Sequence, residues 1–288
     1  MQHCGSIGSR GPNGDGAGIA RLFVNWRQTA DGKPSNPRDP GDPSYDFSAI
    51  DGQVNDASAH GLEILITFGS APAWAEGKGR PKKAVAGTWK PSPAAVGDFA
   101  AALARRYSGS YGGFPRVRDF QVFNEVNLDL YLSPQWSGGR PFAAEHYSKM
   151  LSAAYAGIHS VSQSDRVVTS GLAPYGDPRG GDRTRPLVFW RAAFCLKGRK
   201  QLKPKSCRGF AEPKFDVFAH HAINTSGAPT QSARHPDDAS SGDLPAVVRI
   251  LRAAERHGRA GGPKDANDGR QIAARGVVGM PCALGRGP

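Results

Sequence analysis

The order of apolar segments most strongly limits what this chain can fold into. Short runs rich in Val, Ile, Leu and Phe alternate with longer segments in which apolar residues recur at helical spacing. Strands that alternate with helices require a parallel sheet with helical crossovers. The pattern predicts strands at 19–26, 62–68, 119–123, 166–172 and 215–221, and helices at 45–60, 92–107, 143–161, 185–196 and 244–257.

The spacing of these segments is typical of a TIM (β/α)8-type barrel rather than a doubly wound sheet, and no Gly-rich phosphate-binding loop follows a strand. A complete barrel needs more strands than the pattern supplies, so the first strand and strands 7 and 8 are missing or unrecognisable. We expect an atypical Gly-rich segment at 1–18, the barrel domain at 19–258 and a Gly/Arg-rich tail at 259–288. We interpret the chain as an incomplete or frame-disturbed product of a longer barrel gene.

The charge and hydropathy patterns restrict the partners of the chain. Its formal net charge is +12, but arginine is scattered and lysine is concentrated only at 78–83 and 197–205. This distribution favours a solvated basic surface over a nucleic-acid interface. No run approaches the roughly 18 apolar residues of a membrane helix, and no signal peptide is visible at the N-terminus. We therefore expect neither nucleic acid nor a membrane as a partner.

The four cysteines give a limited prediction about the compartment. Cys195 and Cys207 flank a Lys-rich, turn-like segment, and this spacing suits a disulfide that pins a surface loop in an oxidising environment. The alternative is two free thiols. Cys4 and Cys282 lie in the atypical end segments. Neither a CxxC motif nor a Cys/His pair at metal-ligand spacing is present, so we expect no metal and no cofactor.

The stretch from 119 to 127 is the strongest candidate for chemistry. An apolar alternating run ends in Asn124 and Glu125, with Asn127 and Tyr131 just beyond. Glutamate forms strands poorly and is costly to bury without partners, so it has few structural reasons to end a buried strand. In parallel barrels the C-terminal strand ends carry the catalytic residues. We therefore predict that Glu125 is a general acid/base; the structural alternative is a salt-bridged or helix-capping residue.

Several motifs give the region from about 19 to 258 a resemblance to a known group of enzymes. It resembles clan A glycoside hydrolases, such as the cellulase-like family 5 and the xylosidase-like family 39. The matching pieces are Arg21-Leu-Phe-Val-Asn-Trp26, Tyr45-Asp-Phe with Ile50-Asp51, Gly61-Leu-Glu-Ile-Leu-Ile-Thr-Phe68, Pro72-Ala-Trp74, Phe123-Asn-Glu-Val-Asn127 and His220-His221. Their order and their positions at strand ends make the match specific to the clan, though not to a substrate.

The resemblance implies roles for individual residues. Glu125 would be the acid/base of a retaining mechanism, and Asn124 would bind the sugar hydroxyl next to the reacting carbon. Arg21 would hold the nucleophilic carboxylate ionised, and its alternative is a structural arginine. His221, or as the less favoured choice His220, would contact the sugar or the acid/base, although a core histidine is the competing interpretation.

Aromatic side chains on loops after strands are candidates for stacking on sugar rings. They are Trp74, Tyr131 and Trp136, and we add Asn127 as a further substrate-binding candidate.

The sequence departs from the clan at the second carboxylate. Retaining hydrolysis needs a nucleophile about 5 Å from the acid/base, and in this clan it is a Glu that ends the seventh strand. No Glu follows Glu255, and the corresponding segment offers only Asp265 and Asp268. No residue of this chain can therefore be assigned as the nucleophile.

The resemblance implies a glycosidase that hydrolyses O-glycosyl bonds in oligo- or polysaccharides, acts as a monomer, and is secreted or at the cell surface. Because the nucleophile is missing, activity of this chain is open. The alternative is a non-catalytic carbohydrate-binding barrel that keeps the aromatic cleft. A third interpretation is a chain that does not fold stably, because missing strands leave sheet edges exposed.

Overall fold

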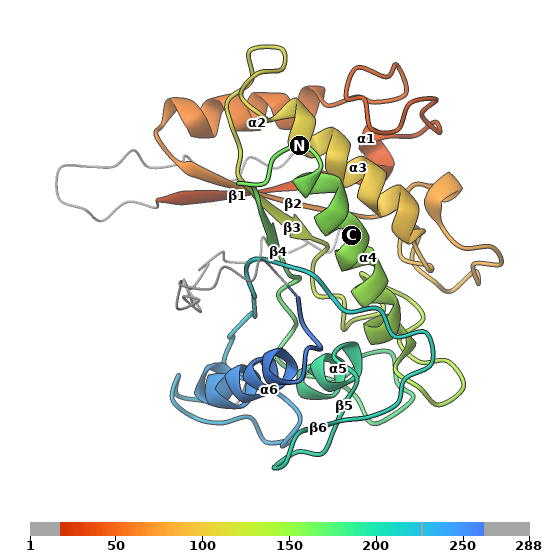
Figure 1. The fold of residues 1–288 in the computed structure, drawn as a ribbon, viewed down its shortest axis with the longest axis vertical. Helices are drawn as coiled ribbons and strands as arrows, with labels where there is room; N and C mark the ends of the chain where they lie inside the picture. The colour runs from red at the N-terminus through yellow and green to blue at the C-terminus, as the bar shows by residue number, and fades with distance from the viewer. Residues whose placement is uncertain (1–17, 226, 262–288) are drawn as a thin grey trace, which may run out of the picture.

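The computed structural model describes residues 18–225 and 227–261, and Figure 1 shows its arrangement. Four parallel strands form one sheet in the order β1-β2-β3-β4. Helices follow the strands along the chain and cover the outer face of the sheet. The strands are β1 Ile19–Asn25, β2 Glu63–Gly69, β3 Asp119–Val122 and β4 Arg166–Val168. The predicted fold class is confirmed: the described residues form an incomplete α/β barrel.

The helices agree closely with the predicted segments. They are α1 Trp26–Thr29, α2 Ser48–Ala59, α3 Pro93–Arg106, α4 Phe142–His159, α5 Pro186–Ala193 and α6 Leu244–Arg256, with 3-10 turns at Ala73–Ala75 and Ser241–Asp243. In Figure 1, α2, α3 and α4 lie along the sheet, whereas α5 and α6 lie together at the other end of the molecule. The short helix α1 was not predicted, because a single turn gives no periodic signal.

Side chains that alternate along the strands divide the sheet into two faces. Leu22 and Val24 of β1 and Ile66 and Phe68 of β2 join the hydrophobic core beneath the helices. Residues between them point to the inner face, which is less completely covered: Phe23 keeps 46% of its surface exposed. The inner face therefore has room for polar side chains.

Small residues allow α3 and α4 to pack closely. Ser92 caps α3 by accepting a hydrogen bond from the Ala95 amide, and Pro93 occupies the first turn. A side-chain carbon at Gly157 in α4 would lie 2.1 Å from the Gly97 carbonyl oxygen in α3. No other residue fits at Gly157 without moving a helix, so this glycine allows the close spacing between α3 and α4.

The predicted strand at 215–221 is not a regular strand. It pairs with the β4 side of the sheet only through isolated parallel bridges, Val168 to Val217 and Leu172 to His220. The four residue steps from Val168 to Leu172 therefore lie opposite the three steps from Val217 to His220. This one-residue mismatch is a bulge, which interrupts a ladder and bends the chain. For the same reason the strand predicted at 166–172 ends at Val168.

The segment between the two central cysteines contains a small hairpin, β5 Leu196–Lys197 and β6 Lys203–Pro204, whose strands are antiparallel. A disulfide joins Cys195 to Cys207 with 6.0 Å between their Cα atoms, which confirms the predicted pairing. Cys4, Cys282, Asp265 and Asp268 lie outside the described residues, and the predicted domain limits stay predictions.

Candidate active site

Glu125 and Asn124 lie where β3 ends, at the carboxyl edge of the sheet. The backbone turns sharply there, because Phe123 and Glu125 both adopt left-handed conformations with φ values of 62° and 37°. Such values are unfavourable for residues other than glycine and cluster at functional sites. The turn is held by the Glu125 amide, which donates to the Gly171 carbonyl at 3.2 Å.

Glu125 is bound by one of the two predicted histidines. Its Oε1 lies 2.8 Å from Nδ1 of His221, and the two side chains are 19% and 21% exposed. In the described part of the chain Oε2 has no partner, so it is the oxygen that remains for a ligand. Gly171 makes this arrangement possible, because a side-chain carbon there would lie 2.2 Å from the His221 ring.

His220 has a different position from its neighbour. Its Nε2 lies 2.8 Å from the Ala239 carbonyl oxygen, and burial lowers the pKa of its ring. It therefore ties the segment before α6 to the strand end. The structure thus supports the choice of His221 over His220 as the histidine at the site.

Arg21 reaches Asn124 from β1. Its Nη2 donates to Asn124 Oδ1 at 2.8 Å, and its Nε donates to Thr67 Oγ1 at 2.8 Å. Burial lowers the pKa of Arg21, whereas the negative charge of Glu125 opposes this shift. Within residues 18–225 and 227–261, no carboxylate lies at ion-pairing distance from Arg21. The half-buried Arg21 side chain is therefore hydrogen-bonded only to neutral groups, with the charge of Glu125 nearby.

Tyr131 completes the cluster. Burial raises the pKa of its hydroxyl, and the charge of Glu125 raises it further, whereas a hydrogen bond from Asn124 and the Arg21 charge act in the opposite direction. The ring is half-buried. Arg21, Asn124, Glu125, Tyr131 and His221 are thus brought together as the sequence predicted.

Asn127 is a correction to the predicted site. It is fully buried, and its side-chain nitrogen donates to the carbonyls of Ala173, Tyr175 and Thr184, while its oxygen accepts from the Ala173 amide. Every polar atom of this side chain is therefore used inside the protein. Asn127 anchors the loop after β4 and does not face a sugar.

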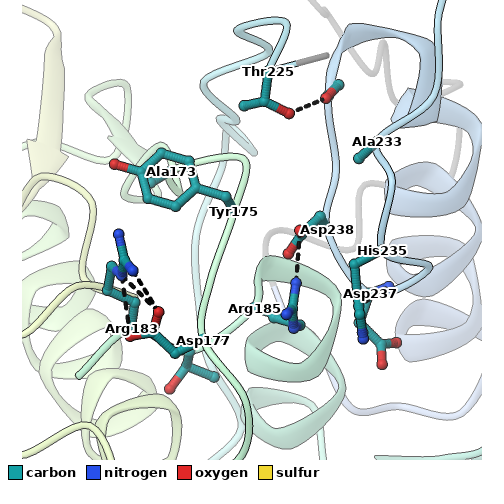
Figure 2. Close-up of polar contacts among 12 residues, drawn as sticks. Ala173, Tyr175, Asp177, Arg183, Arg185, Thr225, Ala233, His235, Asp237 and Asp238 are labelled. Atoms are coloured by element: carbon teal, nitrogen blue, oxygen red, sulfur yellow. Dashed lines mark hydrogen bonds and ion pairs between the residues drawn. The ribbon is translucent and has the colours of Figure 1, made fainter. Parts of the chain in front are cut away.

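The loop that Asn127 anchors carries Tyr175, which the sequence analysis missed. Tyr175 keeps 39% of its surface exposed, and the Arg183 guanidinium lies 5.4 Å from its ring. Figure 2 shows the ring extending from this loop beside the ion pair of Arg183 with Asp177. Its only sequence signal was its place after the predicted strand at 166–172.

The two predicted tryptophans, Trp74 and Trp136, have contacts other than those that hold the Glu125 cluster together. The Trp74 indole nitrogen donates to the Ala30 carbonyl at 3.1 Å, and its ring packs edge-on against Trp26 at 5.7 Å. Trp136 is half-buried, with a buried indole nitrogen that has no hydrogen-bond partner. A role for either in sugar stacking stays a prediction.

The other glutamates within the described residues lie away from this cluster. Glu76, for example, accepts from the backbone amides of Gly87 and Trp89 and so shapes the loop after β2. Glu145 pairs with Arg140 at 3.7 Å. The remaining three are at the start of β2, before the bulged segment and in α6: Glu63, Glu212 and Glu255. None of them takes the place of the expected nucleophile.

Two further searches concern the described residues only. No group of three or more His, Cys, Asp or Glu side chains is arranged there to hold a metal ion. No helix there combines the length and the apolarity needed to cross a bilayer.

Comparison with known proteins gives structural matches only. No family model and no curated protein matches the sequence. A glucosidase from Croceicoccus marinus is 16% identical with a TM-score of 0.46, covering 85% of this chain and 43% of its own. A monomeric beta-xylosidase from Caulobacter crescentus CB15 is 17% identical with a TM-score of 0.43, covering 86% and 50%.

A family 39 glycoside hydrolase from Bacteroides cellulosilyticus WH2 is 21% identical with a TM-score of 0.35, covering 54% of this chain and 27% of its own. The chain thus spans between about a quarter and a half of the length of these three structures. Because all three similarities are distant and partial, the functional proposal depends on the geometry of the site. The chain is similar in structure to glycoside hydrolases, the group of enzymes that its motifs indicate.

Proposed function

We propose that this site is the acid/base half of a retaining glycoside hydrolase that acts on O-glycosyl bonds of oligo- or polysaccharides. One observation carries the proposal: Glu125 is held by His221 at 2.8 Å beside Arg21, a cation with no carboxylate partner in the described part of the chain. A glycosidic oxygen is a poor leaving group unless it is protonated, and a positioned carboxyl group can supply that proton.

The geometry suggests how the first step proceeds. His221 occupies Oε1 of Glu125, so Oε2 would deliver the proton to the leaving oxygen. The bond between that oxygen and the anomeric carbon then breaks, and its electron pair goes to the departing alcohol. A carboxylate or azide ion supplied from solution forms the new bond to the anomeric carbon, and Glu125 is left as a carboxylate. Asn124, oriented by Arg21, would bind the neighbouring sugar hydroxyl. Arg21 would hold the second carboxylate in its ionised form by its positive charge.

A nucleophile supplied from solution tests this assignment. An aryl glycoside with a good leaving group should be turned over slowly, and azide or formate should accelerate the reaction by replacing the missing carboxylate. The Glu125→Gln variant should lose activity on substrates with poor leaving groups by at least about a hundredfold, the usual contribution of general acid catalysis. Full activity in this variant on such substrates would refute the role of Glu125.

A non-catalytic carbohydrate-binding barrel is the second candidate. It is favoured by the position of the other five glutamates, none of which lies at the site. Such a protein would bind oligosaccharides in calorimetry but would release no aryl alcohol, with or without azide.

We also propose that the protein acts as a monomer, without nucleic acid or a membrane as a partner, and that it is secreted or at the cell surface. The disulfide between Cys195 and Cys207 supports the location, because such bonds persist in oxidising compartments. Thiol counting on protein isolated from the medium and from cells tests this.

A further inference from the structure

A continuous series of hydrogen-bonded side chains, called the polar chain below, lies across the inner face of the sheet beneath the candidate site. This inner face is called the inner wall. Arg21 Nε donates to Thr67 Oγ1 at 2.8 Å, and Thr67 Oγ1 donates to Gln121 Oε1 at 2.8 Å. Gln121 Nε2 in turn donates to the Thr169 carbonyl at 3.0 Å. The polar chain therefore links β1, β2 and β3 to the residue that follows β4, with one side chain from each of the first three strands.

Burial makes the polar chain different from ordinary surface hydrogen bonding. Thr67 is fully buried and Gln121 is 3% exposed. They are directly opposite each other in the register of β2 and β3, in strands whose other residues are largely apolar. Buried polar groups are costly unless they are paired.

The direction of the hydrogen bonds is fixed from one end. A guanidinium has only donors, so Thr67 must accept from Arg21 and give its own hydrogen to Gln121. Gln121 must then present its oxygen to Thr67 and its nitrogen to the Thr169 carbonyl. Only one orientation of each group satisfies the whole polar chain, and this orientation places the Nη2 atom of Arg21 against Asn124.

We propose that Thr67 and Gln121 are positioning residues that hold Arg21 in its anion-binding orientation before any carboxylate or sugar is present. Asn124 is oriented in turn, because its oxygen accepts from Arg21 and its nitrogen is left to donate. The importance of the polar chain for catalysis rests on the proposed function. The preorganisation of Arg21 itself does not, and it can be tested without turnover.

Thr169 offers a matched control within the same wall. It is also a fully buried threonine, but its hydroxyl accepts from the Ala219 amide at 2.8 Å, and only its backbone carbonyl belongs to the polar chain. The change Thr169→Val therefore removes a buried hydroxyl without breaking the link to Arg21. Thr67→Val removes the link with the same change of atoms, and Thr67→Ser keeps it.

The experiment follows the Nε–H group of Arg21 by nitrogen-resolved NMR, with the signal assigned by its loss in Arg21→Lys. In the unaltered protein this hydrogen should exchange with solvent far more slowly than those of exposed arginines. Thr67→Val and Gln121→Leu should speed its exchange roughly tenfold or more, the effect of losing one hydrogen bond to a charged group. Thr67→Ser and Thr169→Val should leave it nearly unchanged.

Sodium formate serves as the carboxylate probe in a second measurement. Its titration should shift the Arg21 signal, and Thr67→Val should weaken formate binding several-fold relative to Thr169→Val. Rapid exchange of Arg21 in the unaltered protein would overturn the proposal even if both test variants failed to fold. Equal effects of Thr67→Val and Thr169→Val would also overturn it. A protein that hydrolyses no glycoside but shows the expected exchange pattern would refute the proposed function and support the positioning role.

Discussion

Two regions of the molecule each contain a partly buried arginine, but only one of the two arginines is hydrogen-bonded to a carboxylate. Between α2 and α3, Arg106 binds Asp51 through two hydrogen bonds of 2.7 and 2.5 Å, and the Tyr107 hydroxyl donates to the same carboxylate. Burial lowers the pKa of Arg106, but the bonds and charge of Asp51 outweigh it, so the net shift is upward.

On the inner wall of the sheet, Arg21 is bound by Thr67 and Asn124, which carry no charge, and burial shifts its pKa downward. The positive charge of Arg106 is balanced by the Asp51 carboxylate, and this ion pair joins α2 to α3. Arg21 has no hydrogen-bonded counter-ion among the described residues, although the charge of Glu125 acts on it from nearby. The two arginines therefore differ in their partners: Arg106 is bound to a carboxylate, whereas Arg21 is hydrogen-bonded only to neutral groups among the described residues.

The largest expected effect is in the helical layer. Asp51→Ala would leave Arg106 shielded without a counter-charge, and we expect it to lower the free energy of unfolding by about 3 kcal/mol. Both side chains keep 13–14% exposure, which limits the loss. Urea unfolding measures it, and Asp56→Ala on the exposed side of α2 is the control. A loss equal to that of the control would remove the contrast between the two arginines.

The regular elements and the inner face of the sheet also differ in how much of each could be predicted from the sequence. The strands and helices were predictable because apolar periodicity dominates them, and Asn124 with Glu125 was recognisable because polar groups at a strand end are unusual. The hydrogen-bonded polar side chains on the inner face of the sheet were not predicted. Thr67 and Gln121 are polar residues within apolar runs, and their pairing depends on a register that only the assembled sheet defines.

Asn127 and the segment after β4 show the other limit. A polar residue next to a catalytic motif has the same sequence signal whether it binds a sugar or, as here, the backbone of a neighbouring loop. The strand predicted at 215–221 failed for a related reason. Its composition favours a strand, but the extra residue between Val168 and Leu172 prevents continuous pairing.

Four histidines differ, as the two arginines do, in whether their partner is charged or neutral. His159 and His221 each lie against a carboxylate, Asp216 and Glu125. His146 and His220 instead contact backbone carbonyls, and burial lowers the pKa of both rings below the ordinary 6.5. The folded protein keeps these two rings neutral, whereas the unfolded chain protonates them below about pH 6.5.

Stability contributed by these two histidines is therefore complete above pH 6.5 and is lost as the pH falls toward their folded pKa values. The slope is at most about 1.4 kcal/mol per pH unit for each. Urea unfolding at pH 7.5 and 5.5 measures it. The double variant His146→Gln with His220→Gln should flatten the dependence, whereas the exposed His257→Gln should not. An unchanged slope in the double variant would show that other groups cause it.

The smallest expected effect on stability is at the site itself. Arg21→Met removes a buried cation together with its cost of desolvation, and it leaves two neutral partners that can bind each other or water. We expect the free energy of unfolding to change by no more than about 1 kcal/mol, compared with about 3 kcal/mol for Arg106→Met, which strands Asp51. Formate should no longer bind in the Arg21 variant. Equal destabilisation by the two substitutions would mean that Arg21 supports the fold as Arg106 does, and that its charge is not reserved for a ligand.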